Sequence, residues 1–429
     1  MAKHASKFSA LQVVEPARAM SVQVPLPMLD LLANAHNAFF DLCIDVGQQV
    51  FSALMEQDRE GLCGPKGQHD PHRRASRAGS TLGDITLGGR RIAIRRLRAR
   101  SREGAELALP SFAFAADRDP LDRHTMEAIA CGVSTRKYGR SLERLSEGQE
   151  ERSTSKSAVS RRFVALSQKQ MTAWLSAPLD ALDLRVLMID GIVFHEHTVL
   201  IVLGIDADGA KHVLGLREGT TENRQVAKAL LRDLLERGLD PERARLICID
   251  GSKALRAAIR EVFGSLAPLQ RCQVHKRRNI LEHLPERLHA SVDRILREAW
   301  ESADADLAKR RLERLASSLE AEHPGAAASI REGLDETLTL QRLGIEGALY
   351  RTLRSTNPIE NLNGSIATYT RNVKRWQGGS MIVRWASAAV LDAEKRFRRI
   401  RGYRDLPRLV GALKAIEAEQ NNATDQRVA

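Results

Sequence analysis

The chain has 429 residues, with 66 Lys and Arg against 54 Asp and Glu, and therefore a formal net charge of +12. The length allows two or three domains, and a hydrophobic content of 43% is enough for real cores. So basic a balance is typical of proteins that meet a polyanion, most often nucleic acid, with a merely basic surface as the alternative.

Membrane insertion and secretion are both disfavoured by the sequence. No stretch approaches the roughly 18–20 unbroken apolar residues of a membrane helix. The first residues lack the apolar core and cleavage site of a signal peptide. Five cysteines are scattered without a C-x-x-C pair, which favours a reducing cytoplasm over a disulfide scaffold. We therefore expect a cytoplasmic protein, associated with the nucleoid if DNA is its partner.

The first 120 residues predict a helix over 27–60 and a β-hairpin over 84–101. Gly88-Gly89, flanked by short β-type runs, is a two-residue hairpin signal. Arginine at high density in the second arm suits phosphate contacts, which need charge and forked donors. The alternative is a solvent-exposed edge strand whose charges prevent pairing with other strands. The arginines of this arm are Arg90, Arg91, Arg95, Arg96, Arg98 and Arg100.

The loop before this hairpin contains Cys63, His69 and His72. A fourth zinc ligand is not evident, and the spacing matches no common structural zinc site, so zinc is disfavoured there.

Residues 121–175 predict helices. The stretch 126–145 has the outline of a helix-turn-helix, with Gly132 in the turn and Arg136 and Lys137 in the second, basic helix. Residues 155–166 repeat the theme as a further predicted helix, after a polar hinge at 148–157. This stretch is a candidate DNA-binding region.

From residue 184 the pattern predicts strands and helices in the order β-β-β-α-β-α-β. This order is the plan of an RNase H-like domain. The D-A-D-G sequence at 205–209 is assigned to a hairpin turn. The predicted elements are strands at 184–194, two strands within 198–219, a helix at 221–239, a strand at 244–250, a helix at 251–263, a strand at 268–272, a helical block at 276–350 and a helix within 355–370.

Asp190 and Asp250 each follow an apolar run and precede a glycine, in "VLMIDG" and "LICIDG". Taken singly, either Asp-Gly is also a turn signal. In the predicted topology the two strands are neighbours, so the carboxylates would meet at one end of the sheet. Converging buried carboxylates imply a divalent cation. Gly191 and Gly251 would leave room beside the backbone for a phosphate or metal.

A third carboxylate is expected, because two-metal phosphoryl transfer rarely rests on two aspartates. Glu360, in "STNPIEN", is the candidate. The same residues form a capping-box pattern, with Asn357 as the N-cap and Pro358 at the first helical position. The residue types leave both roles open.

At these residues the chain resembles Mutator-type DDE transposases of bacterial insertion sequences, closely over roughly 185–410 and more loosely before about 150. The resemblance implies an RNase H-like core whose catalytic triad falls on Asp190, Asp250 and Glu360. It also implies that 276–350 is a helical insertion. The matching segments are "IDG" at 189–191, "LGLREGTTENRQV" at 214–226, "ICIDGSKAL" at 247–255, "QRCQVHKRRN" at 270–279, "DETLTLQRLG" at 335–344, "STNPIENLN" at 355–363, and "NVKRW" with "MIVRW" within 372–385.

The resemblance marks Cys272 and His275 as the C-x-x-H signature of the family, beside the fifth strand. Two ligands are too few for zinc, so a small buried cysteine and a histidine that bonds near the metal carboxylates are favoured. For His195 and His197, contact with DNA or an active-site water and an ordinary surface turn stay equally open.

The basic C-terminal tail combines cations with aromatic residues. Lys374 and Arg375 suit phosphate contacts, and an exposed Trp376 would stack on splayed bases. The alternative is that Trp376 and Trp385 pack the last helix onto the core.

These observations predict an Mg²⁺-dependent transposase, with Mn²⁺ as a substitute, that nicks the ends of its element and joins the 3′-hydroxyl to target DNA. It would recognise terminal inverted repeats in double-stranded DNA, and the resemblance implies a homodimer. A non-catalytic DNA-binding regulator and a stand-alone RNase H-like nuclease are the alternatives. The predicted segments are 1–120 with the basic hairpin, 121–180 helical and DNA-binding, 181–275 the first part of the core, 276–350 the insertion, and 351–429 the completed core with its tail.

Overall fold

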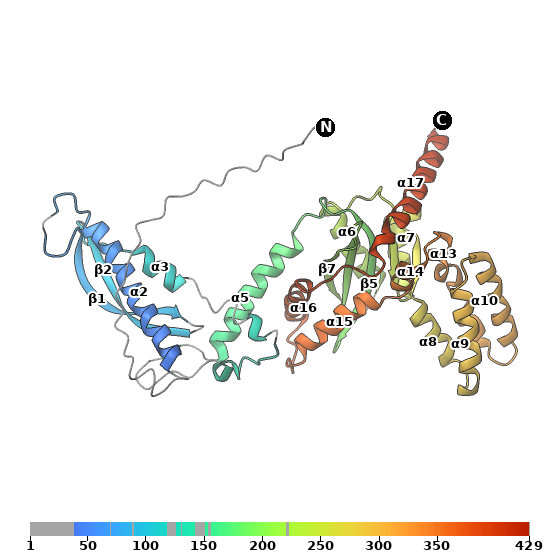
Figure 1. The fold of residues 1–429 in the computed structure, drawn as a ribbon, viewed down its shortest axis with the longest axis horizontal. Coiled ribbons are helices and arrows are strands. Elements are labelled where there is room, and N and C mark those ends of the chain that lie inside the picture. Colours follow the sequence, from blue (N-terminus) through green and yellow to red (C-terminus); the bar gives the residue numbers. More distant parts are fainter. Residues whose placement is uncertain are drawn as a thin grey trace, which may run out of the picture. The chain divides into compact units, whose positions relative to one another are not determined.

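The computed structural model describes residues 38–68, 70–87, 90–117, 126–129, 131–141, 151–152, 156–219 and 223–428. The chain divides into two compact units, one made of 1–125 with 135–159 and the other of 126–134 with 160–429 (Figure 1). Each unit has a buried apolar core of its own. In the part of the chain that is described, no helix combines the length and apolarity needed to cross a bilayer.

The first unit is a small sheet covered by helices. Its core brings Met55 from the long helix together with Ile85 and Ile94 from two long strands. β2 pairs with β1, β3 and β4, each time antiparallel. The elements are α2 (Ala38–Cys63), β1 (Ala75–Leu87), β2 (Arg90–Ser101), β3 (Glu106–Leu107), α3 (Pro110–Asp117), η1 (Tyr138–Ser141) and β4 (Glu151–Arg152).

The predicted hairpin is confirmed, because β1 and β2 pair antiparallel with Leu87 opposite Arg90. β1 starts at Ala75, well before the predicted start at residue 84. The two turn glycines at 88 and 89 lie outside the described residues, as does His69 of the loop before the hairpin. The predicted first helix is confirmed from residue 38, where the description of the chain begins.

The second helix of the predicted helix-turn-helix is not seen in the described residues. Residues 126–129 are helical and a turn follows at Gly132, but 131–141 contain only turns and the 3₁₀ segment η1, so these residues do not form the expected second helix. Residues 142–150 lie outside the described part. The further predicted helix is confirmed and is longer than expected, as α5 (Lys156–Leu175).

The second unit contains a five-stranded mixed sheet in the order β7-β6-β5-β8-β9. β5, β6 and β7 form an antiparallel meander, and β8 and β9 add to β5 in parallel. The predicted succession β-β-β-α-β-α-β is confirmed. The elements are β5 (Leu184–Phe194), β6 (His197–Asp206), β7 (Lys211–Gly219), α6 (Arg224–Glu236), β8 (Leu246–Ile249), α7 (Lys253–Phe263), η2 (Gly264–Leu266) and β9 (Leu269–Arg271).

The apolar run of β5 forms a strand buried on both faces, because its alternate side chains enter two different cores. Val186 and Met188 join one core, with α15 (Asn357–Thr370) and α16 (Gly379–Glu394). Leu187 and Ile189 join the other, with α6 and α7. Helices on both faces therefore fix the strand, so the residue after Ile189 has a defined position.

The turn between β6 and β7 is also confirmed. The Asp206 carboxylate accepts the backbone N–H groups of Asp208 (3.0 Å) and Ala210 (2.9 Å), as an aspartate in a tight turn does.

The predicted helical block follows β9 and has a core of its own, in which Leu296, Trp300 and Leu312 are buried. Its helices are α8 (Gln273–Glu282), α9 (Glu286–Trp300), α10 (Ala305–Leu319), α11 (Pro324–Arg331), α12 (Leu334–Thr337), α13 (Thr339–Arg342) and α14 (Gly347–Leu353). In Figure 1, α8, α9 and α10 lie together in ochre, whereas Leu349 and Leu353 of α14 pack into the core of the sheet. After α15 and α16, the chain ends with η3 (Tyr403–Asp405) and α17 (Leu406–Val428).

Candidate active site

Asp190 and Asp250 stand at the same level of two neighbouring strands. β5 and β8 run parallel with Ile189 opposite Ile249, and the aspartates are the next residues. Burial, and then the negative charge of Asp250, raise the pKa of Asp190 to about 7. The structure therefore brings the two predicted carboxylates together, and their mutual repulsion makes a cation favourable between them.

Neutral donors hold the two carboxylates in place. Asp190 Oδ1 accepts the backbone N–H of Gly191 at 3.0 Å, and its Oδ2 accepts Nδ2 of Asn363 at 2.8 Å. Asp250 Oδ1 accepts the backbone N–H of Ser252 at 3.0 Å. Among the described residues, neither aspartate forms an ion pair with a lysine or arginine. No lysine or arginine of the described residues therefore competes with a ligand for either carboxylate.

The space beside Gly251 is filled, which corrects the prediction of room there for a phosphate or metal. A Cβ at Gly251 would lie 2.4 Å from Nε of Arg271. Gly251 also has φ +121°, a conformation that side chains rarely adopt. Glycine is needed at this position because the Arg271 guanidinium packs against the backbone that follows Asp250.

Glu360 lies on the first turn of α15. Thr356, which is fully buried, precedes this helix as its N-cap and donates its hydroxyl to Glu360 Oε1 at 2.6 Å. The cap is one residue earlier than predicted, and the carboxylate bonds to a side chain rather than to a backbone N–H at the helix start. The capping-box interpretation is therefore wrong, and the Glu360 carboxylate is oriented by Thr356.

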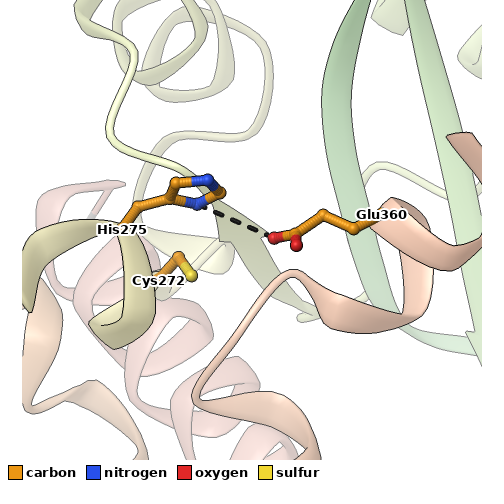
Figure 2. Close-up of side chains that lie close together, drawn as sticks. All are labelled: Cys272, His275 and Glu360. Atoms are coloured by element: carbon orange, nitrogen blue, oxygen red, sulfur yellow. Dashed lines mark ion pairs between the residues drawn. The ribbon is translucent and has the colours of Figure 1, made fainter. Parts of the chain in front are cut away.

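Cys272 and His275 lie next to Glu360 (Figure 2). His275 Nδ1 is 3.8 Å from Glu360 Oε1, and the ligand atoms of all three residues lie within 4.8 Å of one another. Cys272 is buried and its sulfur accepts the backbone N–H of Thr356 at 3.4 Å. This matches the expectation of a small buried cysteine and a histidine near the carboxylates, with Glu360 as a third potential ligand.

Electrostatics couple the members of this group. Hydrogen bonding to Cys272 raises the pKa of His275 to about 9, and the charges of Glu360 and Asp250 act in the same direction. Burial alone would raise the pKa of the Cys272 thiol, but hydrogen bonds from His275 and Thr356 bring it below its usual value. A protonated His275 thus offsets part of the negative charge that the carboxylates bring together.

The sequence reasoning missed two residues of this group, Thr356 and Asn363. They lie four residues before and three residues after Glu360, so helical spacing places all three on one side of the start of α15. This spacing was a usable signal once Glu360 had been singled out. Asn363 Oδ1 is buried and accepts no hydrogen bond within the described structure.

The arginines of the hairpin fall into two groups. Arg96 and Arg98 both bond to Glu106, at 2.8 Å and 2.7 Å, and Arg96 also lies over the ring of Phe112. Arg95 and Arg100 are exposed, and Arg91 is half-buried. The side chain of Arg90 lies outside the described residues. Intramolecular contacts therefore already engage two of the six.

The remaining predicted DNA contacts lie on the surface, with one exception. Arg136, Lys137, Lys374 and Arg375 are exposed. Trp376 is half-buried and packs edge-on against Phe194, with ring centroids 5.2 Å apart.

The two histidines after β5 also receive definite positions. His195 has φ +55° in the turn between β5 and β6, and His197 pairs with Glu218. His197 therefore has an intramolecular partner.

Comparison with known proteins identifies the family of the chain. The model of the family "Transposase, Mutator family" matches residues 28–399. The transposase for insertion sequence element ISRM5 of Rhizobium meliloti is 29% identical over 385 residues, which are 87% of this chain and 92% of the relative. The transposase for insertion sequence element IS256 in transposon Tn4001 of Staphylococcus aureus is 26% identical over 82% of this chain and 90% of its own length.

A third relative, the transposase for insertion sequence element IS6120 of Mycolicibacterium smegmatis, is 31% identical over 220 residues, covering 50% of this chain and 66% of the relative. The family match spans most of the chain, including the strands that carry both aspartates and the helix that carries Glu360. The chain therefore belongs to the Mutator family of transposases of bacterial insertion sequences.

Proposed function

We propose that this chain is a DDE transposase that nicks the ends of its insertion sequence and joins the freed 3′-hydroxyl to target DNA. The observation that carries the proposal is the convergence of three carboxylates from distant parts of the sequence. Asp190 and Asp250 share one level of the sheet, and Asn363 links Asp190 to the helix that bears Glu360. Family membership supports the same reaction.

The proposed fold of the catalytic part is RNase H-like. A three-stranded antiparallel meander extended by two parallel strands, with helices on both faces, supports it. In this proposal the helices from α8 to α14 are an insertion between the fifth strand and α15. The separate core formed by residues from Ile280 to Leu338 supports that division for α8 to α12, while Leu340 of α13 and Leu349 of α14 pack into the core of the sheet.

The donor set fits Mg²⁺. Aspartate and glutamate supply the hard oxygen ligands that Mg²⁺ prefers, and Mn²⁺ accepts the same donors. The raised pKa of Asp190, caused by burial and by Asp250, indicates a site where negative charge lacks compensation from the protein. Asp190, Asp250 and Glu360 would hold the ions, while Asn363 and Thr356 orient two of these carboxylates. Bound Mg²⁺ polarises phosphoryl oxygens and lowers the pKa of water.

The reaction consists of two displacements at phosphorus. In the first, water attacks a phosphodiester at the element end, the P–O3′ bond breaks, and a 3′-hydroxyl and a 5′-phosphate result. In the second, this 3′-hydroxyl attacks a target phosphodiester, and the target's own P–O3′ bond breaks. Both steps place similar charge at phosphorus, so one set of carboxylates serves both. Neither step requires a nucleophilic side chain or a covalent protein–DNA intermediate.

The DNA partner is the double-stranded end of the element, with its terminal inverted repeats, and then the target duplex. The net charge of +12 favours both. We assign end recognition to the segments 1–120 and 121–180, with Arg95 and Arg100 as exposed phosphate contacts. A homodimer would hold two ends together. Such a protein would work at the nucleoid, in the bacterial cytoplasm.

The test compares wild type with Glu360→Gln on labelled duplexes that carry the DNA flanking the gene, with and without Mg²⁺. Nicking and joining to a second duplex are both scored. Glu346→Gln, which removes an exposed carboxylate at the start of α14, is the matched control. We expect wild type and control to nick and join only with metal, and Glu360→Gln to bind the ends without doing either.

Full activity of Glu360→Gln would contradict the assignment of this glutamate. If wild type binds the ends tightly but cuts under no metal condition, a DNA-binding regulator becomes the better account of the chain.

A further inference from the structure

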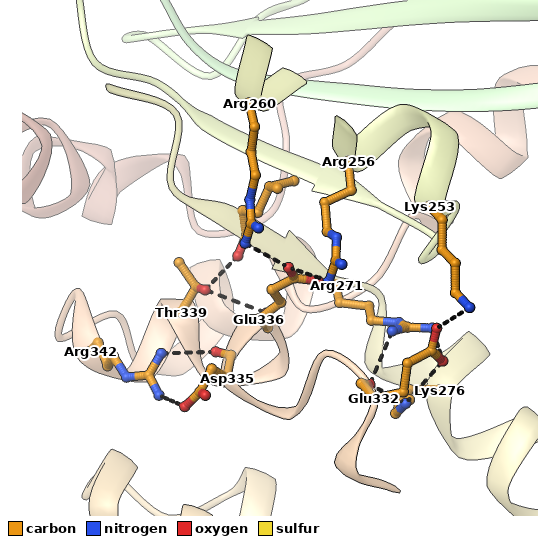
Figure 3. A network of polar contacts seen from close by, with 11 residues as sticks. Lys253, Arg256, Arg260, Arg271, Lys276, Glu332, Asp335, Glu336, Thr339 and Arg342 are labelled. Carbon is orange, nitrogen blue, oxygen red and sulfur yellow. Dashed lines mark hydrogen bonds and ion pairs between the residues drawn. The ribbon is translucent and has the colours of Figure 1, made fainter. Parts of the chain in front are cut away.

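A network of opposite charges joins α7 and β9 to the helical block (Figure 3). Two carboxylates of the short segment from Glu332 to Glu336 face five cations. Counted over these ion pairs alone, the surplus is three positive charges, spread over α7, β9 and α8. The cations are Lys253, Arg256, Arg260, Arg271 and Lys276.

Glu332 faces three of these cations. Its carboxylate lies 3.1 Å from Nη2 of Arg271, and 3.8 Å and 3.9 Å from the Nζ atoms of Lys253 and Lys276. Arg271 also donates to the Glu332 carbonyl at 3.0 Å. The side chains of Arg271 and Lys276 are only 5% and 2% exposed, so these two serve the interior of the network.

Glu336 holds two arginines with a single oxygen. Arg256 Nη1 and Arg260 Nη2 each lie 3.2 Å from Oε1 of Glu336, whose side chain is only 12% exposed. Two guanidinium groups repel each other, and a shared carboxylate allows them to lie close together. One negative charge leaves the pair with a net positive charge and with unused donors in the forked geometry that suits phosphate.

Lys253, Arg256 and Arg260 form the accessible part of the network, with side chains that are 82%, 37% and 61% exposed. Their positions, three and then four residues apart, place them along one side of α7. Between the first and the last, the helix rises about 10 Å, at about 1.5 Å per residue. A DNA strand advances about 3.4 Å per nucleotide along the duplex axis, and its successive phosphates lie farther apart than that along the backbone, so the row is long enough to contact two or more phosphates.

We propose that these three residues, the α7 row, bind the phosphate backbone of the DNA next to the phosphodiester that is cut. The inference takes DNA as the ligand from the proposed function and adds a DNA-binding surface to that function. α7 begins three residues after Asp250, whose carboxylate accepts the N–H of the α7 N-cap, Ser252. A strand lying along the row therefore leads directly to the carboxylates. Glu332 and Glu336 fix the row in advance, which lowers the ordering cost of binding.

The experiment measures how salt weakens binding, because each phosphate contact contributes about 0.9 to the slope of log K against log salt concentration. The variant is Lys253→Gln, Arg256→Gln and Arg260→Gln combined. The matched control combines Arg310→Gln, Arg311→Gln and Arg314→Gln, which removes three exposed arginines from α10. The probe is a duplex that ends in the DNA flanking the gene, bound in EDTA so that no cutting occurs.

We expect the slope of the α7-row variant to become shallower by about 2 to 3, while the α10 control changes by less than about 0.5. An unchanged slope, or an equal change in both proteins, overturns the proposal. Because Glu336 loses its partners in the triple variant, Lys253→Gln alone is measured as well. Its side chain is largely exposed, so the fold tolerates the change, and its slope should fall by about 0.9.

The salt dependence of binding tests the α7 row, and the cutting assay tests the proposed chemistry, so either proposal can be contradicted without the other. If Glu360→Gln still cuts but the α7-row variant loses its slope, the proposed chemistry is wrong and the DNA surface stands. If Glu360→Gln is inactive but the slope is unchanged, the chemistry stands and the α7 row is not a DNA contact.

Discussion

The two ends of the central strands place opposite charges in opposite surroundings. β5 and β8 each follow the pattern of an arginine, four apolar residues and an aspartate, as "RVLMID" and "RLICID". The parallel register sets Val186 opposite Leu246, so both arginines stand together at one end and both aspartates at the other. The same sheet thus provides its own control for what a buried charge does.

At the arginine end, Arg185 faces two carboxylates, whereas Arg245 has a carbonyl and an aromatic ring, and its Nε and Nη1 have no hydrogen-bond partner among the described residues. Arg185 lies 2.7 Å from Asp183 and 3.4 Å from Glu417 of α17. Arg245 donates to the Asp240 carbonyl at 2.6 Å and packs over the ring of Phe263. Burial lowers the pKa of Arg245 to about 10, which still leaves it charged at neutral pH. These contacts suit a structural role.

At the aspartate end, neutral donors orient the carboxylates and two negative charges face each other. Buried charge without a counter-charge is costly, so a fold that retains it gains something other than stability. The comparison supports a structural role for Arg185 and the role proposed for the two aspartates. Four substitutions break or sharpen this contrast.

The largest effect is expected for Asp250→Asn. In the proposed mechanism Asp250 holds metal, so its replacement should remove several kcal/mol of transition-state stabilisation and slow nicking by about 10³-fold or more. Without metal, the free energy of unfolding should not fall, because the repulsion with Asp190 disappears. Single-turnover nicking and urea unfolding in EDTA measure the two quantities. A protein destabilised by more than about 1 kcal/mol would show that this carboxylate is structural after all.

The second prediction concerns Gly251→Ala, with Gly344→Ala as its matched control. Both glycines have positive φ, +121° and +66°, but a Cβ meets Arg271 at the first position and nothing within 4 Å at the second. Backbone strain alone should cost the control about 1 kcal/mol of unfolding free energy. The greater backbone strain at φ +121° and the displacement of the buried Arg271 should together raise the cost at Gly251 to about 3 kcal/mol.

Equal losses in urea unfolding would show that Arg271 moves aside at little cost. The α7 row and the Asp250 loop would then be less firmly connected than the network of Figure 3 implies.

Much of this site could be predicted from the sequence, because its signals are local. An apolar run followed by Asp-Gly identifies a buried strand and its carboxylate, within β5 for Asp190 and directly after β8 for Asp250, and the order of strands brings the two together. The predicted hairpin and the turn at Asp206 followed from equally local patterns. The strand order and both aspartates required no knowledge of packing.

The parts that were wrong depend on contacts between segments far apart in the chain. The side chain of Arg271 occupies the space that was predicted to be open beside Gly251. Its position is set by β9 and by the ion pair with Glu332. The N-cap of α15 is Thr356 rather than the predicted Asn357. Glu360, which was expected to close a capping box, instead accepts a hydrogen bond from the Thr356 hydroxyl. No pattern within a short window contains this information, because tertiary packing decides it.

A third prediction tests the neutral donors with Asn363→Ala. Without its Nδ2 donor, Asp190 loses one of two orienting hydrogen bonds, so nicking should slow by about 10- to 100-fold and more Mg²⁺ should be needed for half-maximal activity. Unfolding free energy should change by less than about 1 kcal/mol. Asn361→Ala, an exposed asparagine on the same helix, is the control and should leave both unchanged. A slower rate with an unchanged Mg²⁺ requirement would contradict the positioning role.

The smallest effect is expected at the arginine end, for Glu417→Gln. Glu417 accepts the backbone N–H of Ala244 at 2.8 Å, and a glutamine keeps an oxygen for this bond. The substitution removes only the negative charge that faces Arg185. Arg185 is nearly buried whereas Glu417 is 25% exposed, so screening limits the loss of unfolding free energy to about 1–2 kcal/mol. Glu419→Gln, exposed on the same helix, should cost nothing measurable. The nicking rate of folded Glu417→Gln should stay within about twofold of wild type, since none of the carboxylates proposed to hold metal moves. A large loss of nicking without a loss of stability would show that Arg185 and Asp190 of β5 are coupled. The charge of Arg185 would then not be purely structural.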